Sequence, residues 1–373
     1  MRTLRVIDKR TVFVLGAGAS CPYGYPSGAH LRKLICLNDG FIKHYKEYLK
    51  SGSSAYSIEN VNHFKTAFDK SSIKSIDVFI SNNPRLAPVG KYIIAFEVFR
   101  AEQRSRFREK AMESKLWYSR KCDDPKRDRD FLLRKDFFQG GDWIFYLYNR
   151  LIEGLVGKEA LPDFSNDKIV FITFNYDRSL EHFFYESLCN SFAEVCDDRI
   201  VQYFKQKNLP VNEQISPQNR ELLIQLVMEQ LKILHVYGQI APLKWQSSEG
   251  VDYAPQINEE LLQKASQNIR TIYEEKRNPE LIEAQNLLKQ AEEIFFLGFG
   301  YAPENMEVLG LPESIPPRCQ VYGTAFNMIK EEVNRLYSGL HGGRARDKDI
   351  YLTPTSTLIN DIDCLMLLKK YLN

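Results

Sequence analysis

A short apolar run that ends in glycine constrains the fold of this chain more than any other feature. Thr11–Leu15 reads Thr-Val-Phe-Val-Leu and leads directly into a Gly-Ala-Gly turn. A run without alternation of polar and apolar residues is typical of a strand buried on both faces of a parallel sheet. Glycine or a polar loop, and not a hairpin signal, follows each such run, so we expect parallel strands joined by crossovers. Similar runs recur at Ile169–Thr173, Ile233–Val236, Ile294–Leu297 and Gln320–Tyr322.

Helical patterns lie between these strands, for example in the apolar spacing of Leu281–Glu293. Buried strands that alternate with helices predict an α/β fold with a Rossmann-like, doubly wound parallel sheet. Ligands bind at the carboxyl ends of the strands in such sheets, so the loops there are the candidate functional segments. We expect a single domain over residues 1–373.

Two connections between the strands are longer than a crossover needs. The first joins the strand before Gly18 to the strand before Asn175, and the second continues from there to His235. We expect a helical insertion at about 41–140, covering the ligand edge of the sheet, and a second at about 186–229. Helical patterns in and beside the first insertion are Phe41–Leu49, Ile73–Ile80, Ile93–Lys115 and Trp143–Leu155.

The composition excludes several classes of protein. A formal net charge of +2 argues against a general nucleic-acid binder. No apolar run approaches the roughly 20 residues of a membrane helix, and the N-terminus lacks the pattern of a signal peptide. The 7 cysteines are scattered, without a CxxC pair, which fits a reducing compartment and leaves no zinc ribbon. We therefore expect a cytoplasmic protein without a metal site or membrane association.

The loop Gly16-Ala17-Gly18-Ala19-Ser20 is a candidate for dinucleotide binding. Glycines let the backbone pass close to a pyrophosphate, and free amides at the start of a helix favour negative charge. Cys21 stands where the GxGxxG fingerprint has its third glycine, and a tight strand-to-helix turn is the structural alternative. The position of the loop after the first strand favours nucleotide binding.

Polar side chains end two further strands. Asn175 and Asp177 lie in Thr-Phe-Asn-Tyr-Asp, and an amide with a carboxylate suits ribose hydroxyls or a positioned water. The alternative is an Asx-type turn, in which both side chains cap backbone amides. His235 lies in an apolar strand shortly before Gly238. A core histidine is the common alternative, but a partly desolvated imidazole on a rigid element also suits a general base.

Other glycine loops supply further candidates. Gly298 and Gly300 follow one strand, and Gly323 and Thr324 end another. They suit the adenosine half of a dinucleotide, although glycines follow strands in any α/β sheet. Asp77 lies on a predicted helix of the first insertion, where it either reaches the pocket from above or lies exposed as a capping residue.

The segment Arg100–Lys135 is rich in lysine and arginine, with aromatic residues interleaved. This composition suits a nucleic-acid or partner surface. Acidic residues are interspersed throughout, which favours a solvated helical face. We therefore expect nucleic acid to be involved only indirectly.

The ordered set Gly-Ala-Gly-Ala-Ser, Thr-x-Asn-x-Asp and a strand histidine followed closely by glycine resembles the sirtuin fold over the sheet core. The resemblance implies that Ser20 and the loop glycines contact NAD, that Asn175 and Asp177 bind the nicotinamide ribose side, and that His235 is the base. The chain departs from protein-deacylase sirtuins at two points. It lacks their zinc ribbon, and Cys21-Pro-Tyr-Gly replaces the Ser-Gly-Ile-Pro that follows their glycine loop.

With Tyr-Pro-Ser-Gly and Ser-Ile-Asp-x-Phe added, the pattern is closer to the sirtuin-like NAD glycohydrolases of bacterial antiphage defence. This resemblance implies cleavage of NAD+ to nicotinamide and ADP-ribose, which depletes NAD and stops the growth of infected cells (abortive infection). Little sequence follows Asn327, so sensing is expected through a homo-oligomer or a partner chain. In size and layout the chain is similar to the sirtuin-like subunit that partners a HerA-type hexameric ATPase. An Argonaute-associated partner is the less favoured alternative.

On this reading Asn175 positions a ribose hydroxyl or the water, His235 takes a proton, and the glycine loop holds the pyrophosphate. No metal is required. The sequence leaves three alternatives open. They are NAD-dependent deacylation or ADP-ribosyl transfer, a non-catalytic subunit that binds NAD or ADP-ribose, and nucleic-acid binding through Arg100–Lys135.

Overall fold

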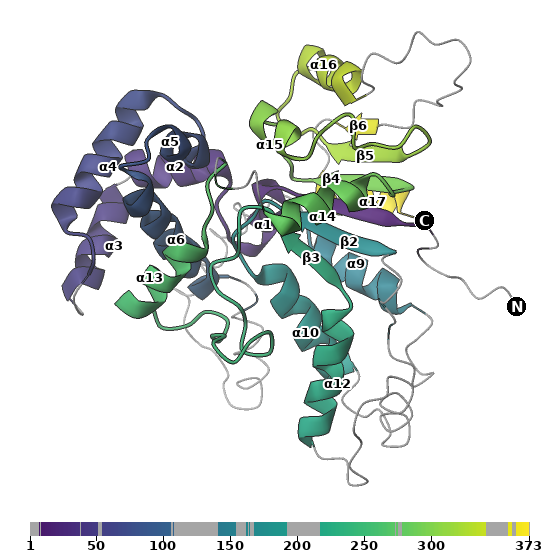
Figure 1. Cartoon of the computed structure of the whole chain (residues 1–373), viewed down its shortest axis with the longest axis horizontal. Helices are drawn as coiled ribbons and strands as arrows, with labels where there is room; N and C mark the ends of the chain where they lie inside the picture. Colours follow the sequence, from purple (N-terminus) through teal and green to yellow (C-terminus); the bar gives the residue numbers. More distant parts are fainter. Residues whose placement is uncertain are drawn as a thin grey trace, which may run out of the picture.

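A six-stranded sheet forms the centre of the protein in a computed structural model (Figure 1). The strands lie in the order β3-β2-β1-β4-β5-β6, and every neighbouring pair is parallel. This is the strand order of the doubly wound Rossmann fold, so the predicted fold class is confirmed. The strands are β1 (Thr11–Leu15), β2 (Ile169–Thr173), β3 (Lys232–His235), β4 (Glu293–Leu297), β5 (Gln320–Thr324) and β6 (Thr357–Ile359).

The structure describes residues 7, 9–37, 39–50, 54–105, 107, 141–153, 162, 164, 168–191, 217–272, 274, 278–340, 357–359 and 363–372. Within these residues, no helix is long and apolar enough to cross a membrane.

The central strand β1 explains the apolar run from which the fold was predicted. All five of its residues are buried, because β2 and β4 flank it and helices cover both faces of the sheet. Phe13 stacks on Phe171 of β2 at 5.2 Å and on Phe295 of β4 at 5.4 Å between ring centroids. A polar residue at these positions would lose its hydration without gaining a partner.

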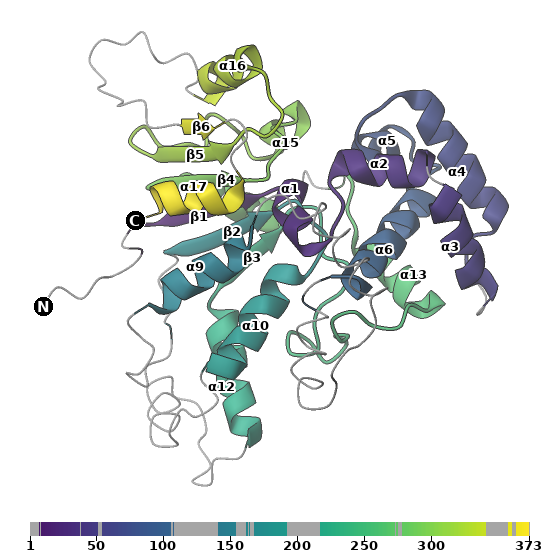
Figure 2. The same ribbon diagram turned by 180° about the vertical axis from the view of Figure 1, so that it is seen from behind.

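Helices cover the two faces of the sheet. Figure 2 shows α9 (Trp143–Ile152), α10 (Ser179–Ser191) and α17 (Cys364–Tyr371) on one face. Figure 1 shows α14 (Pro279–Leu288) on the opposite face. Three further helices lie around these layers: α12 (Pro217–Glu229), α15 (Pro303–Val308) and α16 (Lys330–Leu340).

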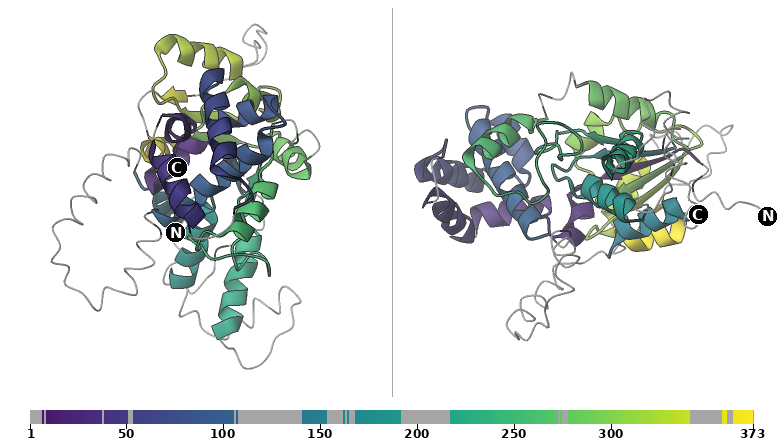
Figure 3. Two further views of the ribbon diagram at one scale, coloured as in Figure 1. Left: turned by 90° about the vertical axis from the view of Figure 1, so that its left-hand side faces the viewer. Right: turned by 90° about the horizontal axis from the view of Figure 1, so that it is seen from below.

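A helical lobe lies beyond the carboxyl ends of the strands, as the views in Figure 3 show. Its centre is α6, which is buried nearly all round, as expected for a helix without a polar face. The lobe consists of α2 (Gly28–Cys36), α3 (Asp39–Lys50), α4 (Ile58–Ser71), α5 (Ile76–Asn82), α6 (Ala87–Gln103) and α13 (Glu259–Asn268).

The helices α3 to α6 fall in the segment predicted as a helical insertion, about 41–140, but the lobe has other limits. It already begins at α2, and it includes α13, which comes from the connection between β3 and β4 and packs on α6. The helix predicted over Ile93–Lys115 ends at Gln103, and residues 108–140 lie outside the described residues. In the second insertion, α10 and α12 are helical, and 192–216 lie outside. Strand β6 was not predicted.

The loops after β1 and β4 meet at their backbones, and glycine makes this contact possible. The Gly18 amide donates to the Gly298 carbonyl at 3.0 Å. Gly298 has a φ of +56°, and a Cβ there would lie 2.0 Å from the Ala19 nitrogen. Both the left-handed backbone and the close approach therefore require glycine at this position.

We predict that Gly298→Ala lowers the free energy of unfolding by about 2 kcal/mol or more, because it adds backbone strain and a steric clash. Gly300→Ala is the matched control, since a Cβ there meets nothing within 4 Å. Urea denaturation of both variants measures the difference. Equal stability of the two variants would contradict the described contact.

Candidate functional site

A hydrogen-bond network joins the loops that follow β1 and β2. The Asn175 amide nitrogen donates to the Gly16 carbonyl at 3.0 Å and to the Ser20 hydroxyl at 2.9 Å. The Ser20 hydroxyl donates to Asp177 at 2.7 Å. The Ser20, Asn175 and Asp177 side chains are buried. Three side chains that the sequence singled out are therefore in direct contact at the carboxyl edge of the sheet.

The Asp177 carboxylate also caps the start of α10. Its Oδ1 accepts hydrogen bonds from the amide of Ser179, at 3.1 Å, and from the Ser179 hydroxyl. Burial raises the pKa of Asp177, and its bonds from Ser179 and Ser20 act against this rise. The predicted Asx-type alternative is thus realised for Asp177, in addition to its bond with the glycine loop.

The side-chain oxygen of Asn175 is the exception in this network. Asn175 is 9% exposed, and its Oδ1 is buried without a hydrogen-bond partner among the described residues. Such an atom costs about 1–3 kcal/mol when it stays unbonded. The Asn175 amide nitrogen fixes this oxygen in place, and the oxygen is then a preorganised acceptor for a hydroxyl or water donor.

His235 is bonded to the backbone of Asn175 and is paired with an acid, Glu181. Its Nδ1 contacts the Asn175 backbone oxygen at 2.9 Å, and its Nε2 contacts Glu181 Oε1 at 2.5 Å. Gln239 donates to the same Glu181 oxygen at 2.9 Å. Because a carbonyl oxygen only accepts, Nδ1 carries a proton and donates it. The pair therefore shares a further proton between His235 Nε2 and Glu181.

Two opposing effects set the pKa of His235. Burial is the largest single effect and disfavours the charged ring, but Glu181, the Asn175 carbonyl and Asp177 together outweigh it, and the pKa is raised above its ordinary value. The sequence predicted a partly desolvated imidazole facing a pocket. The structure shows a ring that is 8% exposed with both nitrogens bonded to protein groups. Its role as a base stays a prediction, which now has to include Glu181.

Sequence reasoning missed Glu181. A signal was present, since it is an acidic residue among apolar ones early in α10, four positions after Asp177. One of its oxygens bonds to His235, and the other, Oε2, is buried without a partner among the described residues.

The glycine loop is engaged with the protein itself. The Gly16 amide donates to Leu297 and the Gly18 amide to Gly298, each at 3.0 Å. The prediction that these two amides are free for a pyrophosphate is therefore wrong for the described conformation. Ala17 opens α1 (Ala17–Ser20), which is only four residues long. The Ala19 carbonyl accepts a hydrogen bond from the Trp143 indole at 2.7 Å.

The loop after β4 and the end of β5 support the Gly16–Ser20 loop, because Gly298 accepts a hydrogen bond from the Gly18 amide and is itself held by Thr324. The Thr324 hydroxyl accepts a hydrogen bond from the Gly298 amide at 2.9 Å. Gly323 is buried within β5, and Gly300 is exposed.

Burial and the nearby Asp177 raise the pKa of the Cys21 thiol to about 11, so Cys21 is not a nucleophile at neutral pH.

Asp77 connects the helical lobe to the site. The Tyr176 hydroxyl, between Asn175 and Asp177 in sequence, donates to the Asp77 carboxylate. Ser75 caps α5 and also donates to Asp77, at 3.3 Å. Burial raises the pKa of Asp77 against these two hydrogen bonds. Asp77 therefore reaches the loop after β2, as the sequence allowed, and it is not an exposed residue.

A buried ion pair makes a second connection to the lobe, and the sequence did not predict it. Arg178 bonds Glu102 of α6 through two nitrogens, at 3.0 and 2.7 Å, and both side chains are fully buried. Arg178 also donates to the carbonyls of Pro242, Val251 and Asp252. The bidentate geometry and these additional acceptors satisfy a charge that would otherwise be costly to bury.

Among the described residues, no cluster of three or more His, Cys, Asp or Glu side chains is placed to hold a metal ion. Of the basic segment Arg100–Lys135, only residues 100–105 and 107 are described. Its predicted role therefore remains a prediction. No protein-family model and no curated protein matches this sequence.

We predict that the stability difference between the wild type and Glu181→Gln depends on pH. The folded-state pKa of His235 is raised, so protonated His235 stabilises the fold fully below its unfolded pKa of about 6.5. This contribution is lost as the pH rises through the raised folded-state value. Urea denaturation should show a loss of about 1–3 kcal/mol in the variant at pH 5.5 and a smaller loss at high pH.

Glu283→Gln is the matched control for this prediction, because Glu283 pairs with Lys232 at the surface. Exposed pairs contribute at most about 1 kcal/mol. A pH-independent loss in Glu181→Gln would mean that His235 is not protonated in the folded protein.

We also predict that Glu102→Gln destabilises the protein by about 3–5 kcal/mol, because it leaves the buried Arg178 guanidinium without its counter-ion. Asp252→Asn, which breaks an exposed pair with Lys244, should change stability by less than about 1 kcal/mol. Thermal and urea denaturation compare the two. Similar effects of both substitutions would refute the assigned importance of the buried pair.

Proposed function

We propose that this protein is an NAD+ glycohydrolase that cleaves the bond between nicotinamide and ribose. The observation that carries the proposal is the Asn175 side chain, whose nitrogen is bound to the glycine loop and whose buried oxygen has no partner among the described residues. It lies at the carboxyl edge of a sheet with the Rossmann strand order, where dinucleotides bind. The sequence resemblance to sirtuin-like NAD glycohydrolases supplies the substrate.

In the proposed reaction the bond between C1′ of the ribose and N1 of nicotinamide breaks. Its electron pair goes to N1 and neutralises the pyridinium charge, which makes nicotinamide a competent leaving group. A water oxygen forms the new bond to C1′ and releases one proton. NAD+ and water thus give nicotinamide, ADP-ribose and a proton. Asn175 Oδ1 accepts a hydrogen bond from the attacking water or from a ribose hydroxyl and positions it.

The pair of His235 and Glu181 takes the released proton. The bond from His235 to the Asn175 carbonyl holds the ring beside the residue that positions the water. The proton between His235 and Glu181 must shift, or their bond must open, before the ring accepts another one. Glu181 Oε2, which has no partner among the described residues, offers a second place for this proton. General-base help of this kind contributes about 10²–10⁴ to rate.

The helical lobe covers the proposed site and restricts water. Asp77 and Glu102 of the lobe bind Tyr176 and Arg178, the two residues that flank Asp177. Tyr176 adjoins Asn175 in sequence and Arg178 lies three positions after it, so movement of the lobe would alter the position of the Asn175 oxygen. Such coupling fits an enzyme whose NAD consumption has to be restrained until it is needed.

A non-catalytic subunit that binds NAD or ADP-ribose is the second candidate. The observation in its favour is that His235, Asp177, Gly16 and Gly18 all bond to other protein groups. For the catalytic candidate we further propose a cytoplasmic homo-oligomer in antiviral defence, activated by a partner such as a HerA-type hexameric ATPase. Deacylation or ADP-ribosyl transfer would require an acceptor besides water.

We predict that Asn175→Ala lowers the rate of nicotinamide release from NAD+ by about 10²–10³, because it removes the positioning oxygen. Chromatography of NAD+, nicotinamide and ADP-ribose follows the reaction. Asn286→Ala, on the outer helix α14, is the control and should keep the wild-type rate. Circular dichroism and urea denaturation establish that each variant is folded.

The same samples separate the two candidates. Saturable NAD+ binding without nicotinamide release, unchanged in His235→Gln, would favour the non-catalytic subunit. Release that appears only with an added acceptor would favour transfer chemistry. Absence of both NAD+ binding and cleavage would contradict both candidates.

A further inference from the structure

A cavity of about 630 Å³ lies within the helical lobe, between α5, α6, α13 and the segment that follows α13. Its volume is in the range of small-molecule binding sites. Asn175, Asp177 and His235 are not among its lining residues. It is therefore a site separate from the proposed catalytic one.

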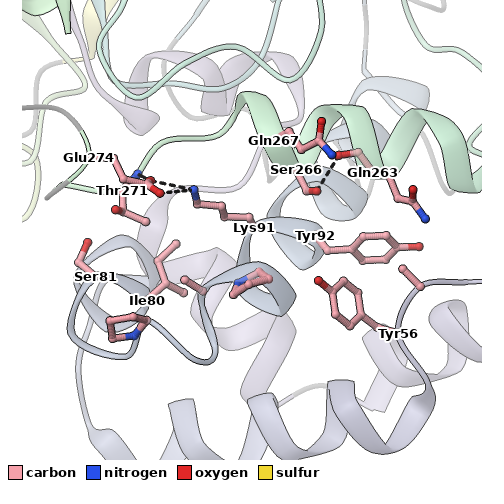
Figure 4. Close-up of a pocket in the computed structure, with 14 residues that line it drawn as sticks. Tyr56, Ile80, Ser81, Lys91, Tyr92, Gln263, Ser266, Gln267, Thr271 and Glu274 are labelled. Atoms are coloured by element: carbon pink, nitrogen blue, oxygen red, sulfur yellow. Dashed lines mark hydrogen bonds and ion pairs between the residues drawn. The ribbon is translucent and has the colours of Figure 1, made fainter. Parts of the chain in front are cut away.

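The two ends of the cavity differ in chemistry (Figure 4). At one end Lys91 pairs with Glu274 at 2.7 Å, and the Lys91 side chain is 14% exposed. At the other end the rings of Tyr56 and Tyr92 meet edge to face, 5.1 Å apart. The Tyr92 hydroxyl is held by Glu259 at 2.6 Å, so its ring is fixed. The amide of Gln263, from α13, lies beside this aromatic end.

We propose that this cavity binds a nucleoside monophosphate. The Tyr56 ring, which is only partly buried and is backed by the fully buried Tyr92, offers a flat face for a base, since aromatic stacking accepts any base. The Gln263 amide nitrogen donates one hydrogen to Glu259 at 2.7 Å, and its second hydrogen and its oxygen supply a donor and an acceptor for the polar edge of the base. Among the described lining residues, Lys91 provides the positive charge, and a phosphate would replace the Glu274 carboxylate as its partner.

Replacement of Glu274 by a phosphate at Lys91 would also affect the residues that follow β3. Glu274 also accepts a hydrogen bond from the Thr271 amide at 2.6 Å, and the neighbouring Arg270 amide donates to the Tyr237 carbonyl at 2.9 Å. Gly238 packs against the Asn268 carbonyl so closely that a Cβ would lie 2.0 Å from it. A phosphate that displaces Glu274 would therefore loosen the segment that holds Tyr237 and Gly238, which lie two and three residues beyond His235.

Binding is tested on the full chain with 5′-AMP, adenosine and inorganic phosphate as probes. Calorimetry gives the Kd, and hydrogen–deuterium exchange locates the ligand. We expect AMP to protect peptides that cover Ile80–Tyr92 and Gln263–Gln267. We expect Lys91→Gln and Tyr56→Leu each to weaken AMP binding about tenfold. Lys264→Gln, an exposed change on α13, is the charge-matched control and should bind as the wild type.

The outcomes distinguish the alternatives. Adenosine should bind about tenfold more weakly than AMP, and phosphate more weakly still. Phosphate binding as tight as AMP binding would overturn the nucleotide proposal in favour of a simple anion site. Protection only near Gly16–Ser20, or an unchanged Kd in Lys91→Gln, would overturn the proposal that AMP binds here.

The effect of bound AMP on catalysis rests on the proposed function and is measured separately from AMP binding. AMP should change the rate of nicotinamide release at saturating NAD+, and Lys91→Gln should abolish this response without changing the basal rate. If AMP binds as described but NAD+ is not cleaved, the binding site stands and the proposed function fails. If NAD+ is cleaved but AMP does not bind, the proposed function stands and the proposed AMP site fails.

Discussion

The hydrogen bonds of the Asn175 amide nitrogen are the interaction on which the site depends. They connect the loops after the neighbouring strands β1 and β2, because one donor group of Asn175 contacts both the Gly16 carbonyl and the Ser20 hydroxyl. The same bonds orient the Asn175 oxygen, which is buried and has no partner among the described residues. A structural restraint and a candidate functional atom thus belong to one side chain. Substitutions here must be interpreted with stability data at hand, since loss of activity and loss of loop geometry are coupled.

Two buried contacts extend this restraint into the helical lobe. Tyr176 reaches Asp77 on α5, and Arg178 reaches Glu102 on α6. Both donors come from the short segment that also carries Asn175 and Asp177. Separating the buried pair would leave an unpaired charge in the interior, which is strongly unfavourable. The lobe is therefore held in a defined position over the carboxyl edge of the sheet, and movement of one part requires a change in the other.

The sequence predicted the sheet well because strands buried on both faces give unbroken apolar runs, as in Thr11–Leu15. It missed β6, whose three residues are too few to form a pattern. It identified Ser20, Asn175 and Asp177, which end strands that become neighbours in a doubly wound sheet. It did not find Glu181 as the partner of His235 or Glu102 as the partner of Arg178. These pairs are 54 and 76 positions apart in sequence, and only the packing of helices brings them together.

Cleavage of NAD+ in water enriched in ¹⁸O tests the central claim most directly. The proposal that water attacks C1′ predicts nicotinamide without label and ADP-ribose that carries one ¹⁸O atom at C1′, both resolved by mass spectrometry. A single label also excludes an added nucleophile as the acceptor. Unlabelled ADP-ribose, or NAD+ that stays intact while bound to the protein, would contradict hydrolysis at this site.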